Sequence, residues 1–360
     1  MELKNINLTK RNSIDFCLSK EDTAILKGIA ICGMLCWHLF HCPNPIGVEF
    51  SAFTKWIGLM GDVCVSVFLF VSGLGLSISY KNVETEDTQF SAMRYVFRRL
   101  IKFYSGYWVI FALFIPIGVF FFNQQVCDSP LTMSSVKIWI KEFLAIGGFS
   151  SYNVSWWFNA LIISLYILFP LLYYGVKHAC IPTILIAYFL RHTDFICIGM
   201  NMGLYMFIFV LGIVAALYSS NITSFLRKLP SIVIYVSTGI FILIPSLVLP
   251  MMDDEYVFYS GLKLYALLTI GFVLVVVLLL KKTKYIKFVL TNLGKHSANI
   301  YLMHTFIFYY WFPDYFYSLR SPIVIFGCLM VFCLLLSGMI EYGKEKLGYN
   351  KIVSYILGKI

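Results

Sequence analysis

The chain has 360 residues, of which 60% are hydrophobic and only 13% charged. Soluble domains are about half apolar and about a quarter charged, so this composition excludes an ordinary water-soluble enzyme. The net charge of +10 would suit a nucleic-acid-binding protein, but the basic residues lie between apolar runs, as in membrane proteins. We therefore expect an all-α, polytopic transmembrane bundle with membrane lipids as its surroundings and no nucleic acid as partner.

Ten apolar stretches divide the sequence, and a helix needs about 20 mostly apolar residues to cross the hydrocarbon core. They cover residues 22–41, 57–79, 103–122, 155–174, 179–197, 202–218, 231–250, 256–280, 297–313 and 321–342. Each is predicted to be helical because lipid offers the backbone no hydrogen-bond partner. The fifth and sixth are the least regular, since Arg191, His192 and Asp194 interrupt them.

The basic residues assign a side to every loop. With alternating spans, 22 of the 28 Lys and Arg residues fall on one side and five on the other, while Lys263 lies inside a span. Cytoplasmic loops carry the basic excess, so both termini are predicted to be cytoplasmic. The expected organisation is a cytoplasmic segment 1–21, a transmembrane domain 22–343 and a cytoplasmic tail 344–360, in the inner or plasma membrane. Residues 1–20 lack the apolar core of a removable signal peptide.

Two features are expected on the outer side of the membrane. Residues 132–147 alternate polar and apolar side chains like an amphipathic helix that lies on the surface. Among the ten cysteines, only Cys42 and Cys127 fall in segments placed outside. One disulfide bond between these two residues is therefore conceivable. No cysteine or histidine spacing resembles a metal site, and no metal is predicted.

Lys27 and His38 lie eleven residues apart in the first span. On an α-helix this is three turns plus about 20°, with a rise of roughly 16 Å, so both side chains share one face. Ionisable residues within a span usually face the bundle interior and mark function, and imidazole suits a general base. The structural alternative makes Lys27 an interfacial anchor, with His38 and His41 at headgroup level.

Ser297, Tyr301 and His304 are spaced by four and three residues, which places them in one polar stripe on an otherwise apolar helix. Such a stripe is expected to face the interior of the bundle. The alternative is a purely structural ladder of hydrogen bonds between helices.

Arg98, Arg99 and Lys102 stand at the cytoplasmic entrance to the third span. Positive-inside sorting explains them by default. The functional interpretation is a phosphate site that faces the cytoplasm, because Arg and Lys bind phosphates well.

Ser72 and Gly73 indicate a close helix contact and not a nucleophile. The chain has no glycine-flanked serine elbow and no paired carboxylates.

Taken in order, these motifs resemble the acyltransferase 3 family, multi-span bacterial proteins that acylate, most often acetylate, hydroxyls of cell-surface glycans. The matching residues are Lys27 with His38, residues 68–73 (FLFVSG), Arg98, Arg99 and Lys102, Trp156, Trp157 and Phe158 leading to Tyr166 and Pro170, Leu293, Gly294 and Ser297, and Tyr301, Leu302 and His304. Each motif alone is weak, but together they are specific because they occur in the family's order on the expected sides.

The resemblance implies that His38 is catalytic, with Ser297, Tyr301 and His304 as the family's late site residues. It further implies that acetyl-CoA is the donor, and that Arg98, Arg99, Lys102 and Lys27 bind its phosphates. The family usually has arginine at position 27, and lysine keeps the charge but loses the bidentate fork. The expected acceptor is a polysaccharide or lipid-linked sugar of the cell envelope, and polysaccharide assembly proteins are expected partners.

Several alternatives stay open at this point. His38 either acts as general base in direct transfer or forms an acyl-histidine intermediate, and Ser297, Tyr301 or His304 donates to the oxyanion. A transporter or flippase for a lipid-linked sugar, or a membrane scaffold, would use the same helices without bond chemistry. The ordered motifs and the lack of an inverted repeat favour the enzyme. The acceptor sugar, the position acylated and the length of the acyl group are not determined by the sequence.

Overall fold

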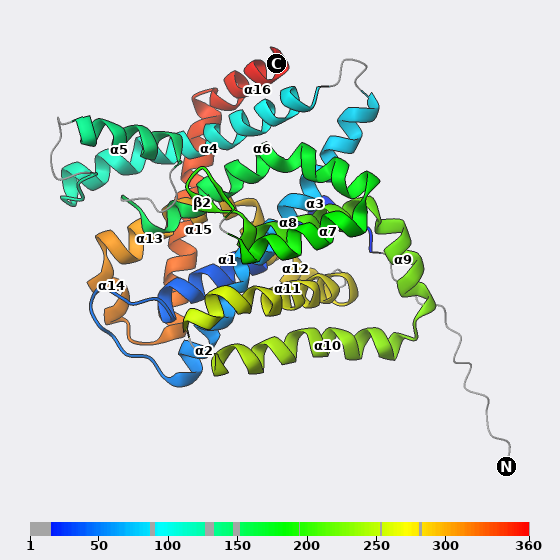
Figure 1. Ribbon diagram of the computed structural model, residues 1–360. Coiled ribbons are helices and arrows are strands. Elements are labelled where there is room, and N and C mark those ends of the chain that lie inside the picture. The colour runs from blue at the N-terminus through cyan, green and yellow to red at the C-terminus, as the bar shows by residue number, and fades with distance from the viewer. Residues whose placement is uncertain are drawn as a thin grey trace.

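The computed structural model describes residues 16–86, 91–126, 133–146, 152–193, 195–252, 254–280 and 283–359, excluding the side chains of 86, 133 and 254–263. Over these residues the chain is a bundle of helices (Figure 1). One small hairpin pairs β1 (Ile196–Cys197) antiparallel to β2 (Met200–Asn201). The predicted all-α class is therefore confirmed.

The helices follow one another with short connections. Those of the first half are α1 (Lys20–Phe40), α2 (Ala52–Gly61), α3 (Val63–Glu86), α4 (Ala92–Phe121), α5 (Met133–Leu144), the 3-10 turn η1 (Val154–Trp156) and α6 (Trp157–His178). Those of the second half are α7 (Cys180–Phe189), the 3-10 turn η2 (Leu190–His192), α8 (Gly203–Leu217), α9 (Ser219–Lys228), α10 (Ser231–Val248), the 3-10 turn η3 (Leu249–Met251), α11 (Asp254–Leu278), α12 (Lys284–Lys295), α13 (Ser297–Thr305), the π-helix η5 (Phe306–Trp311), α14 (Pro313–Ser318), α15 (Pro322–Lys346) and α16 (Tyr349–Lys359).

Six helical stretches among the described residues are long and apolar enough to cross a membrane, or seven if α8 and α9, bent by 80°, count as one span. Each of the ten predicted spans contains helix, but some of these helices are short or interrupted, and the fifth span ends on β1. The ninth, 297–313, is divided between α13, η5 and the start of α14. The described helices thus fit a helical membrane protein with six or seven candidate spans, while the count of ten and the orientation stay predictions.

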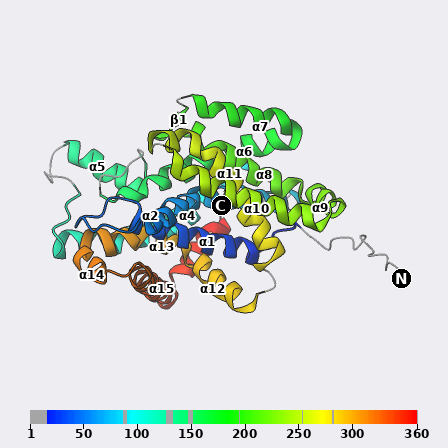
Figure 2. The ribbon, with the colours of Figure 1, turned by 90° about the horizontal axis from the view of Figure 1, so that it is seen from below.

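Helix α1 occupies the middle of the bundle in both views (Figures 1 and 2). It begins at a capping box, in which the Asp22 backbone N–H donates to the Ser19 hydroxyl and the Ser19 N–H donates to the Asp22 carboxylate. It then packs against α2, α3, α12 and α13. This central position explains how Lys27 and His38, both on α1, face a space inside the protein.

Helices α1 and α12 approach closely enough that glycine is required at their contact. A Cβ atom at Gly28 would overlap the carbonyl oxygen of Leu290, and one at Gly294 would overlap that of Ala24. Gly73 on α3 meets the Phe209 carbonyl of α8 in the same way, so its predicted role in helix packing is confirmed.

We expect Gly28→Ala to lower the melting temperature by roughly 5 °C or more, because the added methyl must push α12 away from α1. Gly327→Ala on α15 is the matched control, since a Cβ there meets nothing within 4 Å. Alanine favours helix over glycine, so the control variant keeps or gains stability. Thermal unfolding of both variants in detergent measures the difference, and equal melting temperatures would contradict the close-packing account.

The predicted amphipathic segment is helix α5, within the expected range. Its last turn is fastened to α4, because the Tyr104 hydroxyl donates to the Leu144 carbonyl at 2.8 Å and the Trp108 indole N–H donates to that of Phe143 at 2.9 Å. Its place on the outer surface stays a prediction. Cys127 lies outside the described residues, as does Asp194, so a disulfide from Cys42 to Cys127 also stays a prediction.

Candidate functional site

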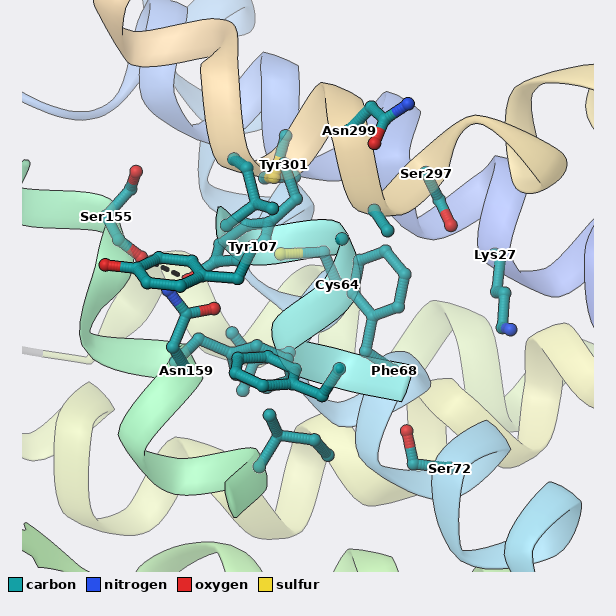
Figure 3. A pocket seen from close by; sticks show the side chains of 18 of the residues that line it. Lys27, Cys64, Phe68, Ser72, Tyr107, Ser155, Asn159, Ser297, Asn299 and Tyr301 are labelled. Atoms are coloured by element: carbon teal, nitrogen blue, oxygen red, sulfur yellow. Dashed lines mark hydrogen bonds between the residues drawn. The ribbon is translucent and has the colours of Figure 1, made fainter. Parts of the chain in front are cut away.

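A cavity of about 450 Å³ lies inside the bundle and is lined mainly by α1, α3, α4, α6 and α13 (Figure 3). Six of the eight site residues expected from the sequence line it: Lys27, His38, Arg99, Lys102, Ser297 and Tyr301. The other two, Arg98 and His304, are not among its described lining residues. Segments far apart in the sequence therefore meet at one cavity, as the ordered motifs require.

His38 stands in the last turn of α1. Its Nδ1 is 3.8 Å from the Cys42 sulfur, and its ring centroid is 4.9 Å from that of His304, with the ring planes tilted by 53°. His38 faces the cavity while His304 is fully buried behind it. The two histidines thus form a pair in which only His38 can reach a ligand in the cavity.

His304 has one ring nitrogen engaged and one without a partner. Nδ1 lies 2.8 Å from the Tyr301 carbonyl oxygen and 3.2 Å from that of Ile300. Carbonyl oxygens only accept, so Nδ1 carries the hydrogen, and Nε2 of the neutral ring is an acceptor. Nε2 is buried and bonds to none of the described atoms. This arrangement suits a residue that orients the His38 ring or receives a proton from it.

The hydroxyl of Tyr301 is already engaged within the protein. It donates to the Ser155 carbonyl at 2.7 Å and lies beside the backbone N–H groups of Phe158 and Asn159 at the start of α6. Figure 3 shows Tyr301, Ser155 and Asn159 at one side of the cavity. Tyr301 therefore holds the beginning of α6 in place, and its hydroxyl hydrogen is not free for an oxyanion in this conformation.

Three cations gather at the other end of the cavity. Lys27, Arg99 and Lys102 are close enough to repel one another electrostatically, and none forms an ion pair with a described residue. Ser297 lies on the same side as Lys27 (Figure 3). A cluster of like charges that has no ion-pair partner among the described residues favours an anionic ligand.

Arg99 is oriented by its own helix. Its Nε donates to the Tyr95 hydroxyl at 3.0 Å, and its guanidinium carbon is 5.0 Å from the centre of the Tyr95 ring. The Tyr95 hydroxyl donates in turn to the Leu76 carbonyl of α3 at 3.0 Å. Arg99 lines the cavity, and a guanidinium group offers the forked geometry that suits phosphate.

The side chain of Arg98 points in a different direction from that of Arg99. Consecutive helical residues point about 100° apart, so Arg98 is turned away from the face that carries Arg99. Its Nε is buried and makes no hydrogen bond to a described atom. The structure thus separates the basic pair, which the sequence motif treats as one unit.

The tryptophan motif forms part of the cavity wall. Trp157, Phe158 and Tyr166 all line the cavity. Trp156 is not among the described lining residues, and its indole N–H donates to the Leu302 carbonyl of α13 at 2.9 Å. This bond ties η1 and α6 to the helix that carries Ser297 and Tyr301.

Sequence reasoning missed several lining residues, of which Asp62 and Asn159 matter most. Asp62 is the one carboxylate among the described lining residues. Asn159 is 1% exposed, lines the cavity, and its Nδ2 donates to no described atom. The sequence did carry a signal for Asp62. It is an ionisable residue inside the apolar run 57–79, and such residues usually mark function, as for His38. Among the described residues, no group of three His, Cys, Asp or Glu side chains is placed to hold a metal ion.

The cavity has cations at one end and a histidine at the other, an arrangement that suits an elongated ligand with an anionic end. The family model for the acyltransferase domain called acyltransferase 3 matches residues 22–342, nearly the whole chain. The chain therefore belongs to the acyltransferase 3 family and is a membrane acyltransferase. No curated protein and no solved structure matches it.

Proposed function

We propose that this acyltransferase moves an acyl group, acetyl in the simplest case, from cytoplasmic acyl-CoA to a hydroxyl of a cell-surface polysaccharide or lipid-linked sugar, in the inner or plasma membrane. The observation that carries the proposal is the single cavity that joins Lys27, Arg99 and Lys102 to His38. Lys27 and His38 are separated along α1 by a rise of roughly 16 Å. This separation suits an extended donor whose charged head and reactive thioester lie far apart.

The donor phosphates fit the cation end. Lys27, Arg99 and Lys102 supply charge there, and the charge count of the loops assigns this end to the cytoplasmic side. The pantetheine arm would extend along α1 past the apolar side chains of Met34 and Phe68, which line the cavity. Its thioester then reaches the imidazole of His38.

The transfer requires one proton acceptor. His38 takes the proton of the acceptor hydroxyl as its oxygen attacks the thioester carbonyl carbon. The tetrahedral adduct then breaks its C–S bond, and the CoA thiolate receives the proton held by His38. The free Nδ2 donor of Asn159 is the group best suited to the oxyanion, because the Tyr301 hydroxyl already donates to Ser155.

An acyl-histidine pathway uses the same atoms in two steps. His38 first attacks the thioester carbonyl carbon, the C–S bond breaks, and CoA leaves as the thiolate. The acceptor hydroxyl then attacks the acyl-imidazolium, the C–N bond breaks, and the hydroxyl proton passes to the released imidazole. Acyl-enzyme trapped without acceptor would support this pathway. A strictly ternary rate law would exclude it.

The direct test compares cell-envelope glycans from cells with and without the protein by mass spectrometry. We expect a shift of one acetyl mass on a defined sugar, present only when the chain is present in the membrane. Identical masses would overturn the proposal. The transporter alternative predicts a different result, in which loss of the protein stops glycan export while acetylation of accessible glycan persists.

A further inference from the structure

Asp62 lies at the junction of α2 and α3 and faces the cavity. No described lysine or arginine lies within ion-pairing distance of it. Cys42 links it to His38, because Cys42 interacts electrostatically with Asp62 and its sulfur is 3.8 Å from the His38 Nδ1. The carboxylate therefore belongs to the His38 end of the cavity, opposite the cation cluster of Lys27, Arg99 and Lys102.

A buried tyrosine hydroxyl stands beside this carboxylate. Tyr265 of α11 is 2% exposed, so its hydroxyl is almost completely buried. It lies close enough to Asp62 for the two side chains to interact. A carboxylate accepts more hydrogen bonds than one phenol can supply, so Asp62 keeps acceptor capacity toward the cavity that it lines. A carboxylate accepts and a phenol both donates and accepts, which matches a ligand hydroxyl.

Aromatic rings surround the same end of the cavity. Trp157 lines it, with its ring 5.7 Å from that of Tyr205, and Tyr205 interacts electrostatically with Asp62. Trp37 also lines the cavity and is held by a stack on His41 at 4.3 Å. Large ring faces with a few fixed polar groups are typical of sites for small organic ligands. A sugar, with apolar C–H faces and hydroxyl edges, has this complementarity.

We propose that Asp62, held in place by Tyr265, forms the acceptor subsite, and that this subsite selects uncharged sugars and rejects acidic sugars. This inference rests on the proposed function, because a sugar bound here is an acceptor only if the protein transfers an acyl group to it. Its physical basis is the opposite charge at the two ends of the cavity. The cation end attracts the donor phosphates, while Asp62 repels any carboxylate or phosphate that would enter beside His38.

Binding tests the subsite without acyl transfer. The purified protein in lipid nanodiscs is titrated calorimetrically with p-nitrophenyl β-glucoside and p-nitrophenyl β-glucuronide, which differ by one sugar carboxylate. We expect the wild type to bind the glucoside about tenfold more tightly, in keeping with the strength of hydrogen bonds to a charged group. Asp62→Asn should weaken glucoside binding about tenfold and abolish the preference, and Asp62→Glu should retain it.

Asp314→Asn is the matched control, because it removes an exposed carboxylate at the start of α14. It should leave both affinities unchanged, and melting temperatures confirm that each variant is folded. Equal affinity of the wild type for the two glycosides, or an unchanged preference in folded Asp62→Asn, would overturn the proposal.

Kinetics with acetyl-CoA separates this inference from the proposed function. Asp62→Asn should raise KM for the glucoside about tenfold and leave KM for acetyl-CoA within twofold. An equal rise in both constants would show that Asp62 is structural. If the binding preference is found but the wild type transfers no acyl group to any envelope glycan, the proposed function is wrong and the sugar site remains.

Discussion

His38→Ala should lower kcat/KM for acyl transfer by about 100- to 10,000-fold, the range that a positioned acid–base group provides. With alanine at position 38, no imidazole in the cavity can take the proton of the acceptor hydroxyl. His304 cannot replace His38, because it is buried behind His38 and does not line the cavity. Transfer of radiolabelled acetyl from acetyl-CoA to envelope glycan, in membranes with matched amounts of protein, measures the loss.

His41→Ala provides the comparison for this variant. His41 follows α1 by one residue and stacks on Trp37, but it is not among the described lining residues. Its replacement should lower the transfer rate by no more than about fivefold. This loss is far smaller than the one expected when a general base is removed. Activity of His38→Ala at a level near that of His41→Ala would remove His38 from the chemistry and leave it a structural role.

The pairing of Lys27 with His38 was accessible from the sequence because it depends only on helix geometry. Eleven residues return a helix to nearly the same face, and both side chains do line one cavity. The stripe of Ser297, Tyr301 and His304 was predicted by the same rule with partial success. Ser297 and Tyr301 reach the cavity, whereas His304 lies at the edge of the stripe and packs against the His38 ring.

Other features depend on how helices pack, which spacing within one helix does not reveal. Asp62 gains its significance from Tyr265 and Tyr205, which arrive from α11 and α8. Asn159 is presented to the cavity because Tyr301 fixes the start of α6. The engagement of the Tyr301 hydroxyl with a carbonyl of η1 was equally inaccessible, since the two groups are 146 residues apart in the chain. The fold class and the main motifs were thus predictable, but the division of roles among them was not.

Arg99→Gln should raise KM for acetyl-CoA by about 10- to 100-fold, because charge-assisted hydrogen bonds to phosphate contribute roughly 1.5 to 3 kcal/mol. The same variant should leave KM for acetyl-pantetheine unchanged, since that donor carries the thioester without the phosphates. Steady-state kinetics with both donors and a saturating acceptor distinguishes loss of phosphate binding from a general defect of the site. We expect kcat with acetyl-CoA to change little, because Arg99 lies at the far end of the cavity from His38.

Arg98→Gln is the most closely matched control that the chain offers. It removes one positive charge from the same turn of α4, so any effect on membrane orientation is the same in both variants. Because only Arg99 lines the cavity, Arg98→Gln should keep KM for acetyl-CoA within about threefold of the wild type, a small effect beside the loss of a charged hydrogen bond. Equal effects of the two substitutions would mean that bulk charge near the membrane, and not a built phosphate site, attracts the donor. A KM increase that also appears with acetyl-pantetheine would instead assign Arg99 to the packing of α4 against α3, through Tyr95 and Leu76.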